Sequence, residues 1–280
     1  QAFRQWLDRQ PDNRVLRKSE QAENFFRKIG ITFNVYGEDE ADERLIPFDV
    51  VPRVLSGNEW RKLSKGIEQR VRAINAFLHD IYHRQEILRA GRVPASLIAN
   101  NAAFLPKMMG FDPPGGIYTH IIGTDIVRTG PDEFYVLEDN ARTPSGVSYM
   151  LENREIMLQM FPELFADIPI REVGDYPSWL RRSLSACAPA ACLDRPTVAV
   201  LTPGVFNSAY FEHSFIADQM GAELIEGSDL RVVDGRVAMR TTQGYKPVDV
   251  IYRRIDDDFL DPLNFNPQSL LGVPGIMDVY

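Results

Sequence analysis

The sequence predicts a mixed α/β fold, and three patterns in the 280-residue chain indicate it. Apolar residues recur at helical spacing after Ser56, which predicts a long amphipathic helix. Two strand-like runs flank the turn residues 129–132, as in a β-hairpin. From Pro196 onward the pattern changes to strand, loop, helix and strand, so we expect a small α/β unit there.

The residues before Ser56 are predicted to form a helix and two short strands. Ser19 is a candidate N-cap for a helix over residues 20–29, and Gly30 is a candidate stop. Residues 31–36 alternate as in a strand. Residues 46–51 are predicted as a second strand, which their prolines would keep near a sheet edge.

The long helix has its own start signal. Ser56 and Glu59 have the spacing of a capping box, so the helix should begin directly after Ser56. Its apolar residues continue to Ile81, and Gly66 is the candidate for a break. Further along, we expect hairpin strands at 117–127 and 133–138 and helices at 147–160 and 177–187. In the α/β unit we expect strands at 197–201, 222–225 and 248–252, a helix at 208–220 and a hairpin turn at 233–236.

The Pro/Ala-rich connector between these helices and the α/β unit is the best candidate for a domain boundary. We therefore expect one domain over residues 1–165, which holds the first helices and the hairpin, and a second over 190–280. The chain opens on Gln1 and closes on Tyr280 in what resembles the first turn of a helix, so we expect further polypeptide beyond Tyr280.

Composition excludes several functional classes. The chain is 44% hydrophobic and 25% charged, as in globular proteins, and no apolar run approaches the roughly 18 residues of a membrane span. Its net charge of −8 argues against a nucleic-acid partner, because binding a phosphate backbone requires a basic surface. Since no apolar run is long enough to span a membrane, we expect no membrane partner. Cys187 and Cys192 are too few for a disulfide framework, so we expect a cytoplasmic protein.

Three polar residues of the hairpin are candidate metal ligands. Glu138 and Asn140 lie two apart, so they share one face of a strand, and the hairpin can place Asp125 across from them. Oxygen ligands of this kind suit Mg²⁺, which takes one or two carboxylates and leaves its other positions to water and phosphate. The alternative interpretation is that these residues are ordinary solvated strand-end side chains.

The same segment offers groups that could bind anions. Arg128 and Arg142 flank the three candidate ligands, and guanidinium groups pair with phosphate or carboxylate oxygens. Ser145 and Gly146 precede a predicted helix, whose N-terminal amides could receive an anion. His79 and His83 lie four apart on the long helix and could share a metal, but no third ligand has a matching spacing, so helix surface is the favoured interpretation.

The motifs GTDIVR at 123–128, EDNARTPSGVSY at 138–149 and YRRIDDDFLDP at 252–262 resemble the circularly permuted ATP-grasp family, whose members are often described as glutathionylspermidine synthase-like. The resemblance covers nearly the whole chain, including the long helix with Arg70 and Asn75. It implies an ATP-grasp fold with a small pre-ATP-grasp subdomain, and ATP and Mg²⁺ as cofactors. It also implies that Asp125, Glu138 and Asn140 bind the metal. One departure is that Gly123 stands where the synthases have an arginine two residues before the strand acid.

The activity that the resemblance implies is a carboxylate–amine ligase, in which ATP converts a carboxylate to an acyl phosphate that an amine attacks. Its substrates would be small molecules or peptides carrying those groups. Arg128 or Arg142 would replace the missing arginine, and Arg254 would meet a phosphate or substrate carboxylate, although it could also be part of a salt-bridged strand end. The loop at 202–207 would help to hold the acceptor, and an ordinary connecting loop is the alternative. The lysines that contact ATP in this family would lie beyond Tyr280, so residues 1–280 are expected to bind ATP poorly.

Two other functions fit the same residues. A metal-dependent phosphohydrolase could use the acids to activate water. A catalytically inactive module that binds a peptide or partner is the third hypothesis, although a binding module has no need of clustered acids that repel one another.

Overall fold

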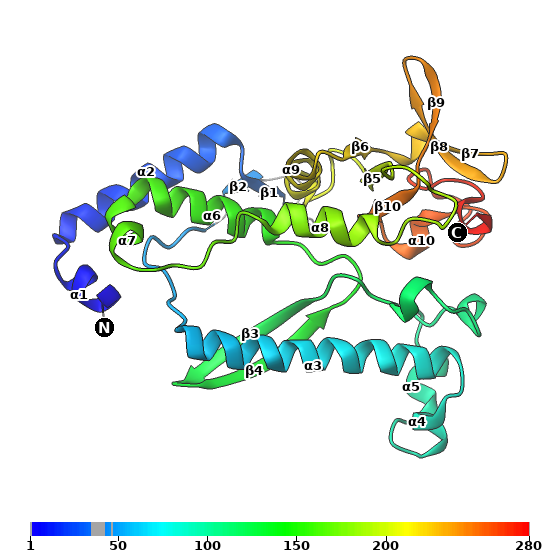
Figure 1. Ribbon diagram of the computed structural model, residues 1–280, viewed down its shortest axis with the longest axis horizontal. Coiled ribbons are helices and arrows are strands. Elements are labelled where there is room, and N and C mark those ends of the chain that lie inside the picture. Colours follow the sequence, from blue (N-terminus) through cyan, green and yellow to red (C-terminus); the bar gives the residue numbers. More distant parts are fainter. Residues whose placement is uncertain (1, 35–42, 46, 280) are drawn as a thin grey trace. The chain divides into compact units, whose positions relative to one another are not determined.

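The computed structural model describes residues 2–34, 43–45 and 47–279 and confirms a mixed helix and sheet architecture (Figure 1). The helices are α1 (Ala2–Asp8), α2 (Asp12–Ile29), α3 (Gly57–Tyr82), α4 (Glu86–Arg89), α5 (Ala95–Ala99), α6 (Val147–Met160), α7 (Pro162–Asp167), α8 (Tyr176–Ser185), α9 (Tyr210–Met220) and α10 (Asp257–Leu260). The strands are β1 (Thr32–Asn34), β2 (Glu43–Leu45), β3 (Gly123–Gly130), β4 (Glu133–Asn140), β5 (Val198–Leu201), β6 (Glu223–Ile225), β7 (Leu230–Val233), β8 (Arg236–Thr241), β9 (Gly244–Pro247) and β10 (Val250–Arg253).

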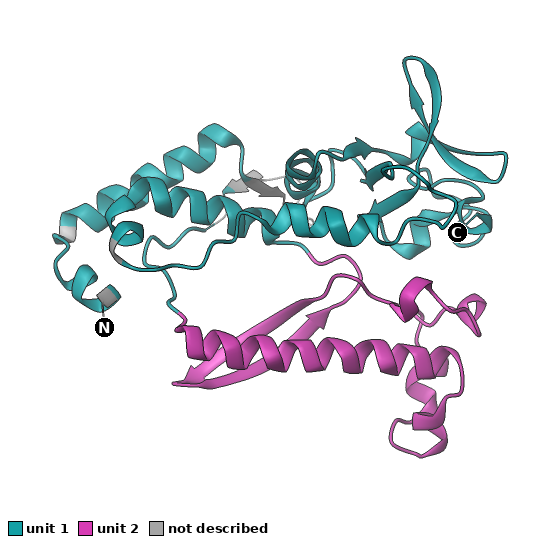
Figure 2. Ribbon diagram, viewed as in Figure 1, with its two compact units in different colours: residues 1–54, 145–280 teal, residues 55–144 magenta. Residues whose placement is uncertain are grey.

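The chain forms two compact units (Figure 2). Unit 1 comprises residues 1–54 and 145–280, and unit 2 comprises residues 55–144. This division differs from the expected segments 1–165 and 190–280. The reason is packing, because α6 contacts both α2 and α9 and thereby joins residues after 145 to the first helices and to the α/β part of unit 1.

Unit 2 consists of α3, the short helices α4 and α5, and the β3–β4 hairpin. The capping box is confirmed, since the Ser56 amide donates to Glu59 Oε2 at 2.8 Å and the Glu59 amide donates to Ser56 Oγ at 3.2 Å. The expected break at Gly66 is wrong, because α3 is continuous through it. Strand β3 begins at Gly123 rather than at Ile117, because the backbone of residues 118–119 bonds to a side chain of α3 instead of to a strand.

Unit 1 contains two hydrophobic cores. One joins α2, α6 and α7 through side chains that include Phe26, Ile156 and Phe161. The other surrounds a parallel sheet of order β10-β5-β6, in which every residue of β5 is buried, as its uninterrupted apolar run predicts. An antiparallel sheet of order β7-β8-β9 contributes Leu230 and Met239 to this second core.

The N-terminal elements correct two sequence predictions. Ser19 is not an N-cap, because α2 already begins at Asp12 after Pro11. Gly30 does end the helix, in the left-handed conformation with φ 74° that glycine adopts readily. The strand expected over 46–51 is not formed by residues 47–51, and β2 lies earlier, at Glu43–Leu45. Of the strand predicted over residues 31–36, the structure describes residues 31–34 and β1 ends at Asn34, whereas residues 35 and 36 lie outside the described part of the chain.

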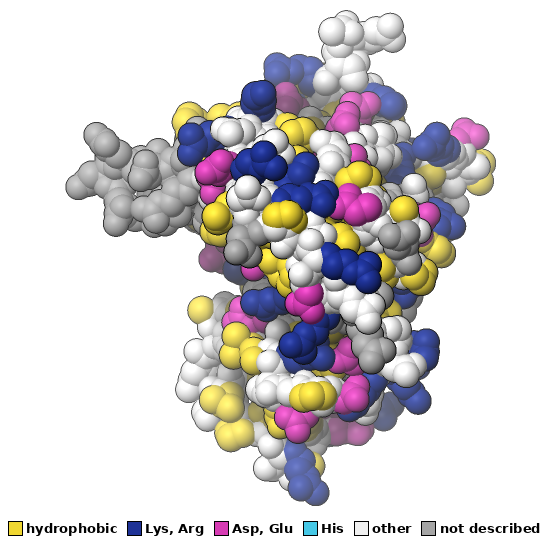
Figure 3. Space-filling view, turned by 90° about the vertical axis from the view of Figure 1, so that its left-hand side faces the viewer, with side chains coloured by type: hydrophobic (Ala, Val, Ile, Leu, Met, Phe, Trp, Pro, Cys, Tyr) yellow, Lys and Arg dark blue, Asp and Glu magenta, His cyan; other side chains and the backbone are white. Residues whose placement is uncertain are grey.

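The surface carries charges of both signs. On the face drawn in Figure 3, Lys and Arg side chains are interspersed with Asp, Glu and apolar ones. Mixed charge of this kind is typical of the surface of a globular domain. Among the described residues, no helix combines the length and the apolar character needed to cross a membrane.

Candidate functional site

The hairpin of unit 2 brings the three candidate metal ligands onto one face. Asp125 lies directly opposite Glu138 in the β3–β4 register, and Asn140 lies opposite Gly123. Cross-strand partners share a face, and so do Glu138 and Asn140, which are two residues apart. Asn140 Nδ2 donates to Glu138 Oε1 at 3.2 Å, so the carbonyl oxygen is the atom that Asn140 would offer a cation. All three side chains are exposed.

Helix α3 covers the opposite face of the hairpin (Figure 1). Its Arg70 donates Nε to Asp139 Oδ2 at 2.6 Å, and Thr124 donates its hydroxyl to Asp139 Oδ1 at 2.9 Å. Asp139 follows Glu138 directly and therefore points to the other side of the strand. The pairing with Arg70 thus fixes the hairpin on α3 and leaves the face with Asp125 and Glu138 accessible.

Arg128 lies on the helix-covered face, away from the candidate ligands. Its guanidinium pairs with Glu59 of α3 and lies over the Phe134 ring, 5.7 Å from the ring centre. The amide and hydroxyl of Ser56, followed by Arg128 and other smaller contributions, lower the pKa of Glu59. Arg128 therefore holds the hairpin to α3, and the structure does not bring it to the three candidate ligands as the sequence analysis expected.

Arg142 follows β4 by two residues and has an exposed side chain. The segment before it is held by buried Thr119, whose hydroxyl donates to the Ala141 carbonyl at 2.6 Å. Thr119 is held in turn by Asn75 of α3, whose Oδ1 accepts from the amides of Tyr118 and Thr119 at 2.8 and 3.1 Å. A chain of hydrogen bonds from α3 therefore positions the end of the strand that carries Asn140.

The structure supplies a reason for glycine at position 123. A Cβ at this position would lie 2.9 Å from Pro144 Cβ, which is closer than side chains approach one another. Any larger side chain at this position, including the arginine expected from the family resemblance, would require Pro144 and its segment to move. Packing at the end of the hairpin therefore favours glycine at position 123.

The Gly123→Ala variant tests this close approach. We expect the free energy of unfolding to fall by about 1–3 kcal/mol, because overpacking forces the backbone to shift. Chemical denaturation of the 280-residue chain measures the change. Gly110→Ala is not a suitable control because its φ is 76°, whereas Gly66→Ala, with nothing within 4 Å of the added Cβ, should be neutral or stabilising. Equal stability of Gly123→Ala and the unmodified chain would contradict the proposed role of Pro144.

A second cluster lies inside unit 1 and centres on Arg254 and Glu212. The two side chains are 2% and 7% exposed, and Arg254 Nη2 lies 3.4 Å from Glu212 Oε1. Arg254 also donates to Ser145 Oγ at 2.7 Å and to the Tyr252 hydroxyl at 3.2 Å. The guanidinium of Arg254 is therefore enclosed by protein groups, and its expected contact with a phosphate or a substrate carboxylate stays a prediction.

Glu212 caps the N-terminus of α6. Its Oε2 accepts from the amides of Gly146 and Ser148, the latter at 3.3 Å. These amides were expected from the sequence to receive an anion. The hydroxyl of Ser145 accepts a hydrogen bond from Arg254. The Gly146 amide and the Ser145 hydroxyl therefore both have protein partners. Glu212 suits its position, since a carboxylate is favourable at a helix N-terminus. No sequence signal singled out Glu212, which lies on α9, 64 residues beyond Ser148.

Burial perturbs the titration of this cluster. It raises the pKa of Glu212, and the Gly146 amide and then Arg254 oppose the rise. Burial, followed by the charge of Arg254, lowers the pKa of His213 from 6.5 to about 3. His213 is 2% exposed, and its Nδ1 lies 2.9 Å from Thr202 Oγ1, which also accepts from the Gly204 amide at 3.2 Å. His213 and Thr202 therefore fix the start of the 202–207 loop.

The lowered pKa of His213 predicts a pH dependence of stability. Between pH 6.5 and about 3 the unfolded chain binds a proton at His213 that the folded chain does not. The unfolded state is favoured by that extra proton, so stability is present above pH 6.5 and is lost as the pH falls through this window. We expect His213→Gln to show a shallower loss of stability than the unmodified chain, measured by urea denaturation between pH 7 and 4. Parallel curves would contradict the assignment.

Comparison with known proteins identifies the family of this chain. The model of a family described as a circularly permuted ATP-grasp matches residues 52–280. An uncharacterized protein of Synechocystis sp. is 50% identical over 98% of this chain and 57% of its own length. An uncharacterized protein of Mycobacterium tuberculosis is 53% identical over 89% of this chain and 44% of its own length. A Frankia casuarinae protein named "Putative glutamate--cysteine ligase 2-2" is 42% identical over 82% of this chain and 27% of its own length.

The match includes the hairpin, α3, the Arg254 cluster and the parallel sheet. The chain spans about half the length of the curated Synechocystis and mycobacterial relatives. Because the family match covers most of its residues, the chain belongs to the circularly permuted ATP-grasp family.

Proposed function

We propose that this chain carries the Mg²⁺-binding hairpin of an ATP-dependent carboxylate–amine ligase, with Asp125, Glu138 and Asn140 as the protein ligands. The observation that supports this most is the accessible face of the hairpin, where these three oxygen donors lie together. Mg²⁺ accepts one or two carboxylates and completes its octahedron with water and phosphate oxygens. The donor set therefore fits the ion that the family uses with ATP.

The other parts of the hairpin support the same function. Mg²⁺ neutralises phosphate charge during phosphoryl transfer when ATP is bound. Arg142 is our candidate for a direct phosphate contact, because its exposed side chain follows Asn140, the last residue of β4, by two positions. In the full-length gene product, we propose that a substrate carboxylate is activated as an acyl phosphate and joined to an amine. Cys187 and Cys192 form no disulfide in the described part of the chain, and our proposal of a cytoplasmic setting rests on the small number of cysteines in the sequence.

The carboxylate and amine are proposed only as classes, namely amino acids or small peptides. The name of the Frankia relative places glutamate and cysteine first among the compounds to test. That relative matches over 27% of its length, so its name does not decide the substrates of this protein.

A product scan on the full-length gene product tests the proposal. The protein is incubated with ATP, Mg²⁺ and a pool of amino acids, small peptides and polyamines, and products are detected by mass spectrometry and ADP release. We expect an adduct that has lost one water, together with ADP, and the loss of both in Glu138→Ala. ADP without an adduct would instead support a phosphohydrolase. Absence of both would support a binding module without catalysis.

A further inference from the structure

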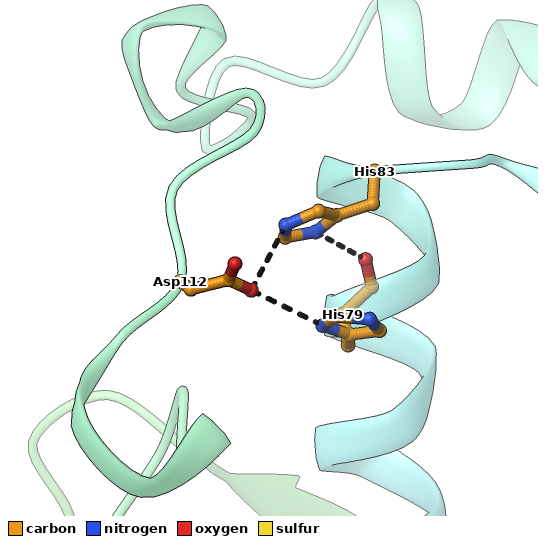
Figure 4. Close-up of side chains that lie close together, drawn as sticks. All are labelled: His79, His83 and Asp112. Carbon is orange, nitrogen blue, oxygen red and sulfur yellow. Dashed lines mark hydrogen bonds and ion pairs between the residues drawn. The ribbon is translucent and has the colours of Figure 1, made fainter.

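Two histidines at the C-terminal end of α3 lie close to an aspartate that is distant in sequence (Figure 4). His79 lies in the last turn of α3, His83 follows directly after the helix, and Asp112 belongs to the loop between α5 and β3. The sequence pattern alone favoured helix surface for this pair, because no third ligand had a matching spacing. The fold supplies that third group, and all three residues belong to unit 2.

The spacing of the side-chain atoms suits a small cation. Asp112 Oδ1 lies 3.1 Å from His83 Nε2 and 4.0 Å from His79 Nδ1. One ligand atom from each residue lies within 4.8 Å of the others. A tetrahedral ion with bonds of about 2.0–2.1 Å holds its ligand atoms about 3.3 Å apart, so only small side-chain rotations separate this arrangement from coordination.

Hydrogen bonding distinguishes the two ring nitrogens of His83. His83 Nδ1 lies 2.9 Å from the His79 carbonyl oxygen, which can only accept, so Nδ1 carries the hydrogen. Nε2 is therefore the ring nitrogen that faces Asp112 and the atom that His83 would offer to a metal. This nitrogen is buried and makes no hydrogen bond within the described part of the chain, although the carboxylate is 3.1 Å away. A cation between the two atoms would satisfy both of them.

The surroundings hold the loop that carries Asp112. The Tyr118 hydroxyl donates to the Phe111 carbonyl at 3.1 Å, and the Gly110 amide donates to the Tyr82 carbonyl at 2.7 Å. Such outer contacts orient the ligands of metal sites. Asp112 is therefore presented to the helix by a fixed loop.

We propose that His79, His83 and Asp112 bind one divalent transition-metal ion of the zinc type. Two imidazoles and one carboxylate form a donor set that zinc prefers and that Mg²⁺ does not. Three protein ligands leave a fourth position for water or an added ligand. His79 and His83 also line a depression of about 650 Å³ that could admit such a ligand. The ion would join α3 to the loop that precedes β3.

Isothermal titration of the 280-residue chain with ZnCl₂ in excess MgCl₂ tests this site. We expect one Zn²⁺ per chain and at least about 100-fold weaker binding in Asp112→Asn, because loss of a direct ligand should cost no less than loss of an outer contact. Asp132→Asn is the matched control, since this exposed turn residue has a φ of 58°, which asparagine tolerates, and its binding should be unchanged.

A second variant and a spectroscopic probe distinguish loss of the metal site from misfolding of a variant. His79 is 55% exposed, so His79→Ala should keep its fold, checked by circular dichroism in metal-free buffer, and should also lose the site. Co²⁺ bound to the unmodified chain should show the visible bands of tetrahedral coordination. Absence of stoichiometric Zn²⁺ binding, or equal binding by the folded variants, would overturn the proposal.

Discussion

Replacement of Glu138 by glutamine is expected to lower ATP-dependent ligation by the full-length gene product at least about 100-fold. Metal ions contribute several kcal/mol of charge stabilisation in phosphoryl transfer, and each 1.36 kcal/mol corresponds to a tenfold change in rate. Glutamine keeps the size of the side chain and its place opposite Asp125 but removes the charge. ADP release at saturating ATP measures the effect, and Asp125→Asn should behave in the same way.

The Mg²⁺ dependence separates a metal ligand from a merely structural residue. In Glu138→Gln, activity should rise with Mg²⁺ concentrations well above those that saturate the unmodified protein, because the weakened site is filled by mass action. Asp132→Asn, at the turn of the same hairpin, removes a charge without touching the proposed ligands and should leave the activity unchanged. A Glu138→Gln protein with unaltered activity and Mg²⁺ dependence would refute the assignment.

Replacement of Arg254 by alanine is expected to destabilise unit 1 by about 3–5 kcal/mol. Removal of one partner of a buried ion pair leaves the other charge without compensation, and Glu212 is 7% exposed. The variant also removes the donor to Ser145 at the start of α6. Urea denaturation followed by circular dichroism measures the loss.

The neighbouring arginine provides a matched control. Arg253 pairs with Asp257 at 2.6 Å, but the two side chains are 31% and 28% exposed, so Arg253→Ala should cost about 1 kcal/mol or less. The double variant Arg254→Met with Glu212→Gln should recover part of the stability, because no charge then remains buried. Equal destabilisation by Arg253→Ala and Arg254→Ala would show that burial does not distinguish the two pairs.

Local sequence patterns were sufficient for much of the fold. The capping box at Ser56 located the start of α3, the apolar run at 198–201 located a buried strand, and Gly30 ended α2. Each of these signals acts over a few residues and needs no distant partner. The short strands β2 and β9 were not predicted, because an edge strand of three or four residues depends on the strand that it pairs with.

The domain division depended on contacts that local patterns do not contain. Residues 145–165 follow the hairpin in sequence, and the Pro/Ala-rich connector after them was the natural boundary. In the structure α6 packs against α2 and α9, so this segment belongs to unit 1. Which face of a helix meets which neighbour is settled by the sum of the apolar area buried across the whole unit.

The sequence by itself determined the face of the candidate metal site. Strand alternation places Glu138 and Asn140 together, and a hairpin turn between the strands brings Asp125 opposite them. Only the tertiary structure decided the partners of the arginines and histidines. Arg128 pairs with Glu59 across 69 residues, Arg254 with Glu212 across 42, and Asp112 reaches His83 from another loop. Strand periodicity is a local property of the backbone, whereas a charged side chain takes whichever partner the packing of distant elements brings within reach.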